Sequence, residues 1–451
     1  MSVMILFGFA LWCVLAILLT IFAPPLLILF FPLKQLVQSS LGFFRETALG
    51  NESINYLVAF TVAMATGYAI FKNRQRVRGF INGTTIIVVA LYSWALLTCL
   101  WSPGGSKGFE VFVSAIPYFV MFFIFLPFLI TTLNEWGQAA RICLVLGTII
   151  TGLILISPEF TMKYGRIGLD LPNAPGGRSN PLALGELGGT CIVLAAFVGT
   201  GFDLLYFKLF RIIGVIVGTI LVVKSGSRGQ LMFAVVSIAL CYPISRPLAG
   251  LKNYIFTAIG LIVTLIIIYY VASLVVSTGS MDTEKRWAEG ATNEGVDARY
   301  SNIIFLLETW LKSPIFWVQG LGFYSFGALN PFGEPYTHCI VVDMLGELGL
   351  IGFTLFLILC LWTWNSCRKI FVTIRDNQTQ RANFSSFLAV LVYHFLLSNK
   401  QGNLAGEFLM IGLMLLAFRI ERKLNFYPDI DFGESSNFSE EISSDPIPPI
   451  F

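Results

Sequence analysis

The chain has 451 residues, of which 56% are hydrophobic, 14% are aromatic and only 12% are charged. Soluble globular domains carry about 25% charged residues, so this composition excludes an ordinary soluble protein and indicates an integral membrane protein. The net charge of +3 is small. It gives no reason to expect nucleic acid as a partner, and membrane topology explains most basic residues better.

Apolar runs close to the roughly 20 residues that cross a bilayer predict the membrane spans. They fall at about 3–23, 55–71, 84–100, 112–132, 140–157, 183–202, 207–223, 230–245, 254–276, 339–364, 384–399 and 404–420. We therefore expect an all-α polytopic membrane protein with about 12 transmembrane helices in residues 1–424. The first span lacks the features of a cleaved signal peptide and is expected to be retained. The apolar run 24–36 begins with Pro24-Pro25, which predicts a break and a re-entrant or interfacial piece.

Short loops rich in Lys and Arg predict the orientation, because these residues accumulate on the cytoplasmic side of a membrane. Such loops are expected around 72–78, 368–381 and 419–423, each after an even number of predicted spans. Both termini are then cytoplasmic, and the long loop 277–338 faces outward. The tail 425–451 is rich in Ser and acidic residues and is predicted to be disordered.

The outward loops also contain basic residues, and an anionic substrate is the simplest reason for them on that side. Arg228 ends the tight turn that starts at Lys224 and leads into a span, where its planar group suits a phosphate at headgroup level. An arginine that snorkels to lipid headgroups is the alternative interpretation. Arg166 and Arg178 lie in a second outward loop and can approach the same surface, although for either one alone a solvated loop is preferred.

Apolar residues recur at helical spacing from Tyr300 to Leu311 and predict an amphipathic helix of about 14 residues that ends before Pro314. This helix is too short to span, so we expect it to rest on the outer membrane surface. Arg299 stands at its predicted start, where the charge opposes the helix dipole. That local cost mildly favours a functional role for Arg299.

His338 lies between the long outward loop and the next span. The positive end of a helix favours a neutral imidazole that can accept a proton, whereas a hydrogen-bonded loop histidine is the alternative. His394 lies inside a span and is interpreted as packing. Asp343 and Glu347 share one helix face below His338, where charge is costly, and they could pair with the arginines.

Cysteine spacing gives no sign of a metal site. Every cysteine except Cys339 falls within or at the end of an apolar span, where it packs as a small hydrophobe. Neither a CxxC pair nor a Cys/His ligand spacing occurs. Neither a disulfide framework nor a bound metal is therefore indicated.

Taken together, these motifs resemble the O-antigen ligase and polymerase superfamily of bacterial polytopic glycosyltransferases, over roughly residues 160–365. The matching features are the turn Ser227-Arg228-Gly229 before a span, the run from Arg299 through Trp310-Leu-Lys-Ser-Pro314 to Gly320-Leu-Gly322, and Thr337-His338 followed by Gly346-Glu347-Leu-Gly349-Leu-Ile-Gly352. One departure is that Cys339 stands where the family usually has asparagine, which leaves any role of that asparagine in doubt.

The resemblance implies transfer of a glycan from an undecaprenyl-diphosphate carrier to an acceptor hydroxyl at the periplasmic face of the bacterial inner membrane, without a cofactor or metal. Such a step belongs to the assembly of O-antigen or another surface polysaccharide. The residue chemistry agrees, because arginines can neutralise a departing diphosphate and a neutral histidine can accept the proton of the attacking hydroxyl. Arg228, Arg299 and His338 are the expected catalytic residues. Further candidates for substrate binding are Arg166, Arg178, Lys224 and Glu347.

Two activities within the superfamily fit the sequence. A polymerase joins repeat units on the carrier, and a ligase moves finished glycan to the lipid A core. Polymerase is slightly favoured, because nothing in the chain specifies a lipid A core acceptor. A transporter of an anion or a lipid-linked sugar is an alternative from another class; against it, the sequence predicts no paired broken helices at mid-membrane.

Overall fold

The computed structural model describes residues 22–40, 48–170, 179–198, 205–245, scattered positions from 255 to 277, and residues 289–426 except 332 and 335. Several sequence predictions fall outside these residues. They concern nearly all of the first span, Arg178, most of the span 254–276, the first part of the loop 277–338, and the tail beyond residue 426.

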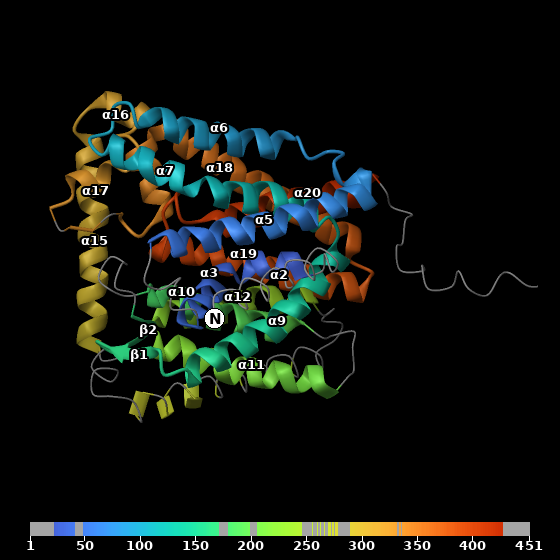
Figure 1. The fold of residues 1–451 in the computed structure, drawn as a ribbon. Helices are drawn as coiled ribbons and strands as arrows, with labels where there is room; N and C mark the ends of the chain where they lie inside the picture. Colours follow the sequence, from blue (N-terminus) through green and yellow to red (C-terminus); the bar gives the residue numbers. More distant parts are fainter. Residues whose placement is uncertain are drawn as a thin grey trace, which may run out of the picture.

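The described chain is mostly α-helical (Figure 1). The helices are α2 (Ala23–Ile28), α3 (Phe30–Ser40), α5 (Ala48–Lys72), α6 (Gly83–Thr98), α7 (Gly105–Phe119), α8 (Leu126–Leu129), α9 (Leu133–Ile156), α10 (Pro181–Phe197), α11 (Leu205–Lys224), α12 (Arg228–Ser245), α15 (Glu289–Leu311), α16 (Pro314–Gln319), α17 (Ser325–Leu329), α18 (Ile340–Ile374), α19 (Gln378–Gln401) and α20 (Phe408–Phe426). A 3₁₀ turn covers Arg74–Arg76, and a π-helical segment, Val120–Phe125, joins α7 to α8.

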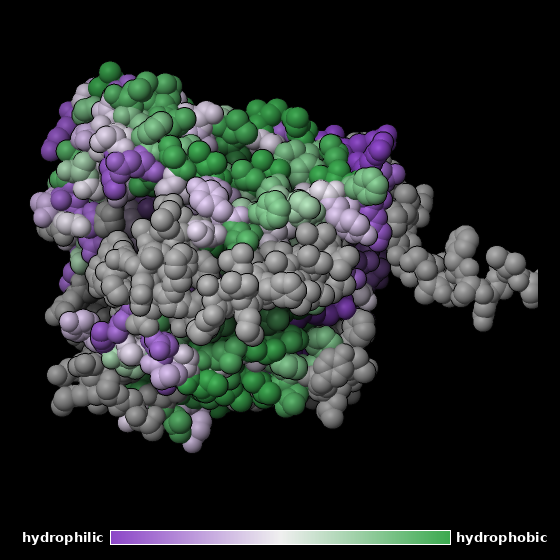
Figure 2. All heavy atoms as spheres, viewed as in Figure 1, coloured by the Kyte–Doolittle hydropathy of each residue, from purple (hydrophilic) through white to green (hydrophobic). Residues whose placement is uncertain are grey.

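Within the described residues, six helical segments are long and apolar enough to cross a membrane. They are Ser53–Lys72 in α5, Gly105–Leu129 from α7 to α8, and the whole of α9, α12, α18 and α19. Helices α6 and α10 are apolar but shorter. Figure 2 shows hydrophobic residues over much of the viewed face and hydrophilic ones toward its two ends. These features agree with a helical membrane protein, and the number of twelve spans stays a prediction.

The proline pair lies at the start of α2, so a helix begins where the sequence predicts a break. Pro24 and Pro25 occupy its first turn, where a proline loses no hydrogen bond because the amides there have no partner within the helix. Helices α2 and α3 are both too short to cross a bilayer. All residues of α2 are buried against other parts of the protein, and a re-entrant or interfacial position of this piece stays a prediction.

The long helices run side by side, and α15 crosses one end of the bundle nearly at right angles to them (Figure 1). We call this the α15 end; α16, α17 and a β-hairpin lie there too. The loop from α5 to α6, the loop from α18 to α19 and the last turns of α20 lie at the opposite end. The loops predicted to be cytoplasmic thus share one end. Which end faces the cytoplasm stays a prediction.

Helix α15 begins earlier than the sequence indicates. It starts at Glu289 and has 23 residues, so Arg299 lies in its middle. The argument that Arg299 opposes the dipole at a helix start is therefore wrong, because dipole effects act only on the first and last turns. Leu306 of α15 is buried against Leu321 and Phe326, which fixes the helix to the loop that follows it.

Two further elements differ from expectation. Helix α18 continues to Ile374, so Arg368 and Lys369 lie in its last turns and not in a loop. The loop before α10, which the sequence predicts to face outward, forms an antiparallel hairpin of β1 (Phe160–Lys163) and β2 (Arg166–Leu169), which an all-α prediction does not include. Strand pairing satisfies backbone groups that a loop would leave to solvent.

Candidate functional site

A break in α18 anchors the loop at the α15 end. Gly349 has φ 67° and ψ −169° within this helix, a conformation open to glycine. The break exposes carbonyl groups that the helix would otherwise use. The carbonyl of Gly346 accepts a hydrogen bond from Leu321 N at 3.0 Å, and that of Glu347 accepts one from Gly322 N at 2.8 Å.

Two of the motifs that carry the resemblance therefore meet in space. Gly320, with φ 77°, lies directly against the backbone of Glu347 and Gly349. A side chain on Gly320 would collide with Glu347, and one on Gly349 would collide with Gly320 and Val318. The two glycines allow the loop after α15 to pack into the break of α18.

The carboxylate of Glu347 holds the same loop. It accepts hydrogen bonds from Tyr324 N at 3.1 Å and from Phe326 N at 2.9 Å. These amides lie at the start of α17, where they lack partners within the helix, and Tyr324 has a left-handed backbone with φ 65°. Glu347 thus orders the loop through its carboxylate. Within the described residues it forms no ion pair with an arginine, so the pairing considered from the sequence is not found.

His338 lies just before α18 in a constrained conformation. Its φ of 68° is unusual for a residue other than glycine. The Thr337 hydroxyl on one side donates to Asp343 Oδ1 at 2.5 Å, which ties the segment to the first turn of α18. The His338 ring packs edge-on against Tyr336, with 4.5 Å between the ring centroids. Neighbours on both sides therefore hold the imidazole in place.

The surroundings of His338 favour its neutral form. Only 19% of its side chain is exposed, and burial is the main reason that its pKa lies below the ordinary 6.5. The positive charges of Arg299 and Lys400 lower the pKa further, whereas Glu334, whose Oε2 lies 3.5 Å from Nε2, opposes the shift. Nδ1 is buried and accepts no hydrogen bond within the described part of the chain. The ring is therefore mostly unprotonated at neutral pH.

Arg228 and Arg299 come from helices far apart in the sequence and lie close enough for their charges to repel each other. Arg228 is the first residue of α12, and Arg299 lies in the middle of α15. Burial lowers the pKa of Arg299 and the Glu334 carboxylate raises it, but a guanidinium stays charged at neutral pH. Among the described residues, Arg299 forms no hydrogen bond or ion pair.

Lys400 brings a third cation to this group. It lies in the last turn of α19, and its charge acts on His338. A Cβ on Gly229 would lie 2.7 Å from Lys400 Nζ, so the ammonium group rests against the first turn of α12 beside Arg228. We call Arg228, Arg299, Lys400 and His338 the outer cluster.

The other candidates are not brought into the outer cluster. Lys224 ends α11 and is half-buried, but no contact in the described chain joins it to Arg299 or His338. Arg166 lies in β2, and its buried Nε has no hydrogen-bond partner in the part of the chain described. The hairpin is at the α15 end (Figure 1). Arg166 therefore lies at the same end of the bundle as the outer cluster but is not a member of it.

Two residues were not singled out from the sequence: Lys400, which belongs to the outer cluster, and Glu334, which lies beside His338. Their signal was weak, because a charged residue beside a span is ordinary. The sequence interpretation also treated His394 as packing. His394 is buried in α19 with Nδ1 3.5 Å from Glu186 Oε1 of α10. A carboxylate inside an apolar span is the signal that could have identified this pair.

Cys339, where the superfamily usually has asparagine, lies beside an asparagine from another helix. Its Sγ is 3.8 Å from Asn399 Oδ1 of α19, and the Asn399 amide group donates to Phe395 O at 2.8 Å. Among the described residues, no group of three or more His, Cys, Asp or Glu side chains is placed to hold a metal ion.

A scan against protein-family models finds no match for this chain, and a search of curated proteins finds none either. The resemblance to the O-antigen ligase and polymerase superfamily therefore rests on the residues themselves. What the structure contributes is their arrangement: Arg228, Arg299 and His338 at one end of a helical membrane protein, next to a loop held by Gly320, Gly349 and Glu347.

Proposed function

We propose that the protein transfers a glycan from an undecaprenyl-diphosphate carrier to an acceptor sugar hydroxyl at the α15 end, on the periplasmic side of a bacterial inner membrane. The observation that carries the proposal is the outer cluster. Its members come from α12, α15, α19 and the segment before α18, and the charges of the cations act on one another and on the histidine.

The cations suit the leaving group. When the glycan leaves its carrier, negative charge grows on the diphosphate, and cations held in place beforehand stabilise that charge without reorganising. Arg228 and Arg299 repel each other when no anion is present, so a diphosphate between them relieves the repulsion. Their planar groups bind phosphate oxygens through paired hydrogen bonds, which a lysine cannot reproduce.

His338 supplies the base. The acceptor hydroxyl oxygen attacks the anomeric carbon, the bond from that carbon to the diphosphate oxygen breaks, and undecaprenyl diphosphate leaves with the electron pair. The hydroxyl proton passes to the imidazole. A base whose pKa lies below neutral pH is available in its unprotonated form when the acceptor arrives, and burial with the neighbouring cations lowers the pKa of His338.

A polymerase is slightly favoured over a ligase that acts on the lipid A core, since no feature of the sequence specifies that acceptor. A transporter of an anion or lipid-linked sugar remains the alternative of another class. Transporters place broken helices around a substrate at mid-membrane. In α18 the break at Gly349 is instead filled by the backbone of Leu321 and Gly322, which favours the enzyme.

The direct test uses purified protein in liposomes with a lipid-linked oligosaccharide donor. Release of undecaprenyl diphosphate together with a longer glycan supports the proposal. Movement of donor or anion across the liposome membrane without glycan transfer would overturn it and favour the transporter. Deletion of the gene then separates the two enzymes on a gel of surface glycolipids: a single repeat unit left on the core indicates a polymerase, and a core without repeat units indicates a ligase.

A further inference from the structure

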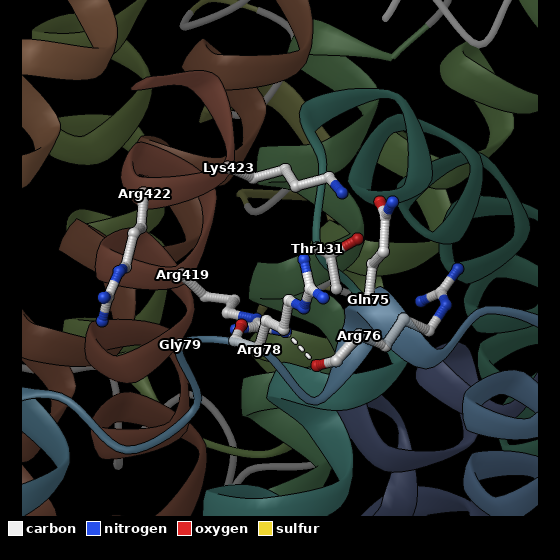
Figure 3. A pocket seen from close by; sticks show the side chains of 8 residues that line it. All are labelled: Gln75, Arg76, Arg78, Gly79, Thr131, Arg419, Arg422 and Lys423. Atoms are coloured by element: carbon white, nitrogen blue, oxygen red, sulfur yellow. Dashed lines mark hydrogen bonds between the residues drawn. The ribbon is translucent and has the colours of Figure 1, made fainter. Parts of the chain in front are cut away.

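The end of the bundle opposite α15 contains a pocket of about 210 Å³ that the proposed transfer reaction does not use. It lies between the loop joining α5 to α6 and the last turns of α20, with Thr131 from the segment before α9 (Figure 3). A single water molecule needs only about 10–15 Å³ of such space. The pocket can therefore admit a group as large as phosphate.

Among the described residues, every charged side chain that lines this pocket is basic: Arg76, Arg78, Arg419, Arg422 and Lys423. We call these five residues the inner cluster. Arg76 forms an ion pair with Glu135 and also donates to Phe128 O at 2.9 Å and Leu129 O at 3.0 Å. Arg419 is repelled by both Arg422 and Arg76.

Arg419 is the residue that ordinary membrane topology does not explain. Basic residues on the cytoplasmic side normally keep their charge in water, but Arg419 is only 6% exposed. Two of its nitrogens donate to the carbonyls of Arg76 and Arg78. Its Nε is buried and has no hydrogen-bond partner in the described chain. A buried charge is costly, and an anion in the pocket that Arg419 lines offsets that charge.

The loop is shaped to bring Arg422 to the pocket. Gly79 has φ 72°, a left-handed conformation that favours glycine. A Cβ at this position would lie 3.1 Å from Arg422 Nε, closer than such contacts normally are. Glycine at position 79 therefore allows the left-handed turn and leaves room for the Arg422 side chain.

We propose that the inner cluster binds a phosphate-bearing anion, either the headgroup of an anionic phospholipid or free phosphate. Clustered guanidinium groups recognise phosphate oxygens through charge-assisted hydrogen bonds, and basic pockets between membrane helices bind lipid headgroups. The site is separate from the outer cluster and does not depend on the transfer reaction.

The test compares thermal unfolding of the full-length protein in neutral detergent at constant ionic strength. The ligands are inorganic phosphate, short-chain phosphatidylglycerol, short-chain phosphatidylcholine and chloride, because a ligand that binds the folded state raises its stability in proportion to occupancy. The pocket variant combines Arg78→Gln, Arg422→Gln and Lys423→Gln. The matched control combines Lys72→Gln, Arg74→Gln and Arg368→Gln, which remove the same charge from exposed positions at the same end.

We expect phosphatidylglycerol or phosphate to stabilise the wild type and the control, and the Kd to rise at least about tenfold in the pocket variant, which corresponds to about 1.4 kcal/mol. Tighter binding of phosphatidylglycerol than of phosphate identifies a lipid headgroup; equal binding identifies free phosphate. If the triple pocket variant does not fold, Arg422→Gln and Lys423→Gln are titrated singly. Equal binding by pocket and control variants, or no advantage of either phosphate ligand over chloride and phosphatidylcholine, would overturn the proposal.

Discussion

The two ends of this helical bundle use arginine in different ways. At the end opposite α15, Arg76 and Arg419 donate to backbone carbonyls and join the α5–α6 loop to the segment before α9 and to α20. Arg381 likewise donates to Ile244 O at 3.0 and 2.8 Å and so connects the start of α19 to α12. At the α15 end, Arg299 makes no such contact with any residue that the structure describes.

A count of basic residues therefore does not distinguish arginines that stabilise the fold from arginines that are placed to bind a ligand. A helix C-terminus offers unpaired carbonyls, and an arginine that satisfies them stabilises the fold. Arg228 and Arg299 instead lie near each other, and their like charges repel, so substitutions at the two ends should have different consequences.

The largest expected effect is all-or-none and concerns topology. Reporter fusions after Arg78, after Arg381 and in the C-terminal tail should read cytoplasmic, and a fusion near Glu289 should read periplasmic, because Lys and Arg of short loops stay on the cytoplasmic side. A cytoplasmic signal at Glu289 would exchange the two ends and place the outer cluster in the wrong compartment for the proposed reaction.

Substitution of His338 should have the next largest effect. Loss of a general base typically costs about 10²–10⁴-fold in rate, so His338→Ala and His338→Asn should nearly abolish transfer while donor binding persists. The asparagine variant is the cleaner one, because asparagine tolerates the left-handed backbone found here. The measurement is transfer in liposomes alongside donor binding.

His394→Gln is the control, since it retains a hydrogen-bonding group beside Glu186 and lies outside the outer cluster. Its effect on transfer should be far smaller. Near-normal transfer by His338→Asn, or equal loss of binding and transfer, would show that His338 is not the base.

Replacement of arginine by lysine tests geometry separately from charge. A lost paired hydrogen bond to phosphate of about 3 kcal/mol corresponds to roughly a hundredfold in rate, so Arg228→Lys and Arg299→Lys should fail nearly as badly as the alanine variants. Arg375→Lys, at an exposed position of the opposite end, is the control and should transfer normally. Full activity of both lysine variants at normal expression would make these arginines membrane anchors.

Glu347→Gln should loosen the loop at the α15 end. The carboxylate accepts from two amides, whereas glutamine presents only one acceptor oxygen and turns a donor toward the other amide. A buried donor left unsatisfied costs about 1–3 kcal/mol, to be measured by thermal unfolding. Glu308→Gln, on the exposed face of α15, is the control. If the Glu347→Gln variant unfolds at the same temperature as the wild type, Glu347 does not anchor the loop.

The smallest expected effect is a shift in a pH profile. Only unprotonated His338 accepts a proton, so transfer should be lost as pH falls through its pKa, which lies below 6.5. Glu334 raises that pKa; Glu334→Gln should therefore move the loss of activity to a lower pH. A shift to higher pH, or no shift, would mean that another group controls the profile.

Much of the helical arrangement could be predicted because hydropathy is a local property. The predicted span 55–71 falls within α5, and the predicted span 140–157 ends one residue beyond α9, since about 20 apolar residues in a row have few alternatives to a helix. The residues at which helices begin and end were less predictable. Helix α15 extends to Glu289 and α18 to Ile374, because a change from apolar to polar residues marks the edge of a membrane span and not the end of a helix.

By itself, the sequence determined the membrane class and marked Arg228, Arg299 and His338 as residues whose chemistry suits a diphosphate and a hydroxyl. The packed fold was needed to show that the charges of Arg299 and Lys400 act on His338, that Glu347 holds a loop, and that Arg419 is buried beside a pocket. Hydrophobicity acts residue by residue, whereas electrostatic interactions and backbone hydrogen bonds depend on distances between segments far apart in the chain. Those distances exist only after the helices have packed.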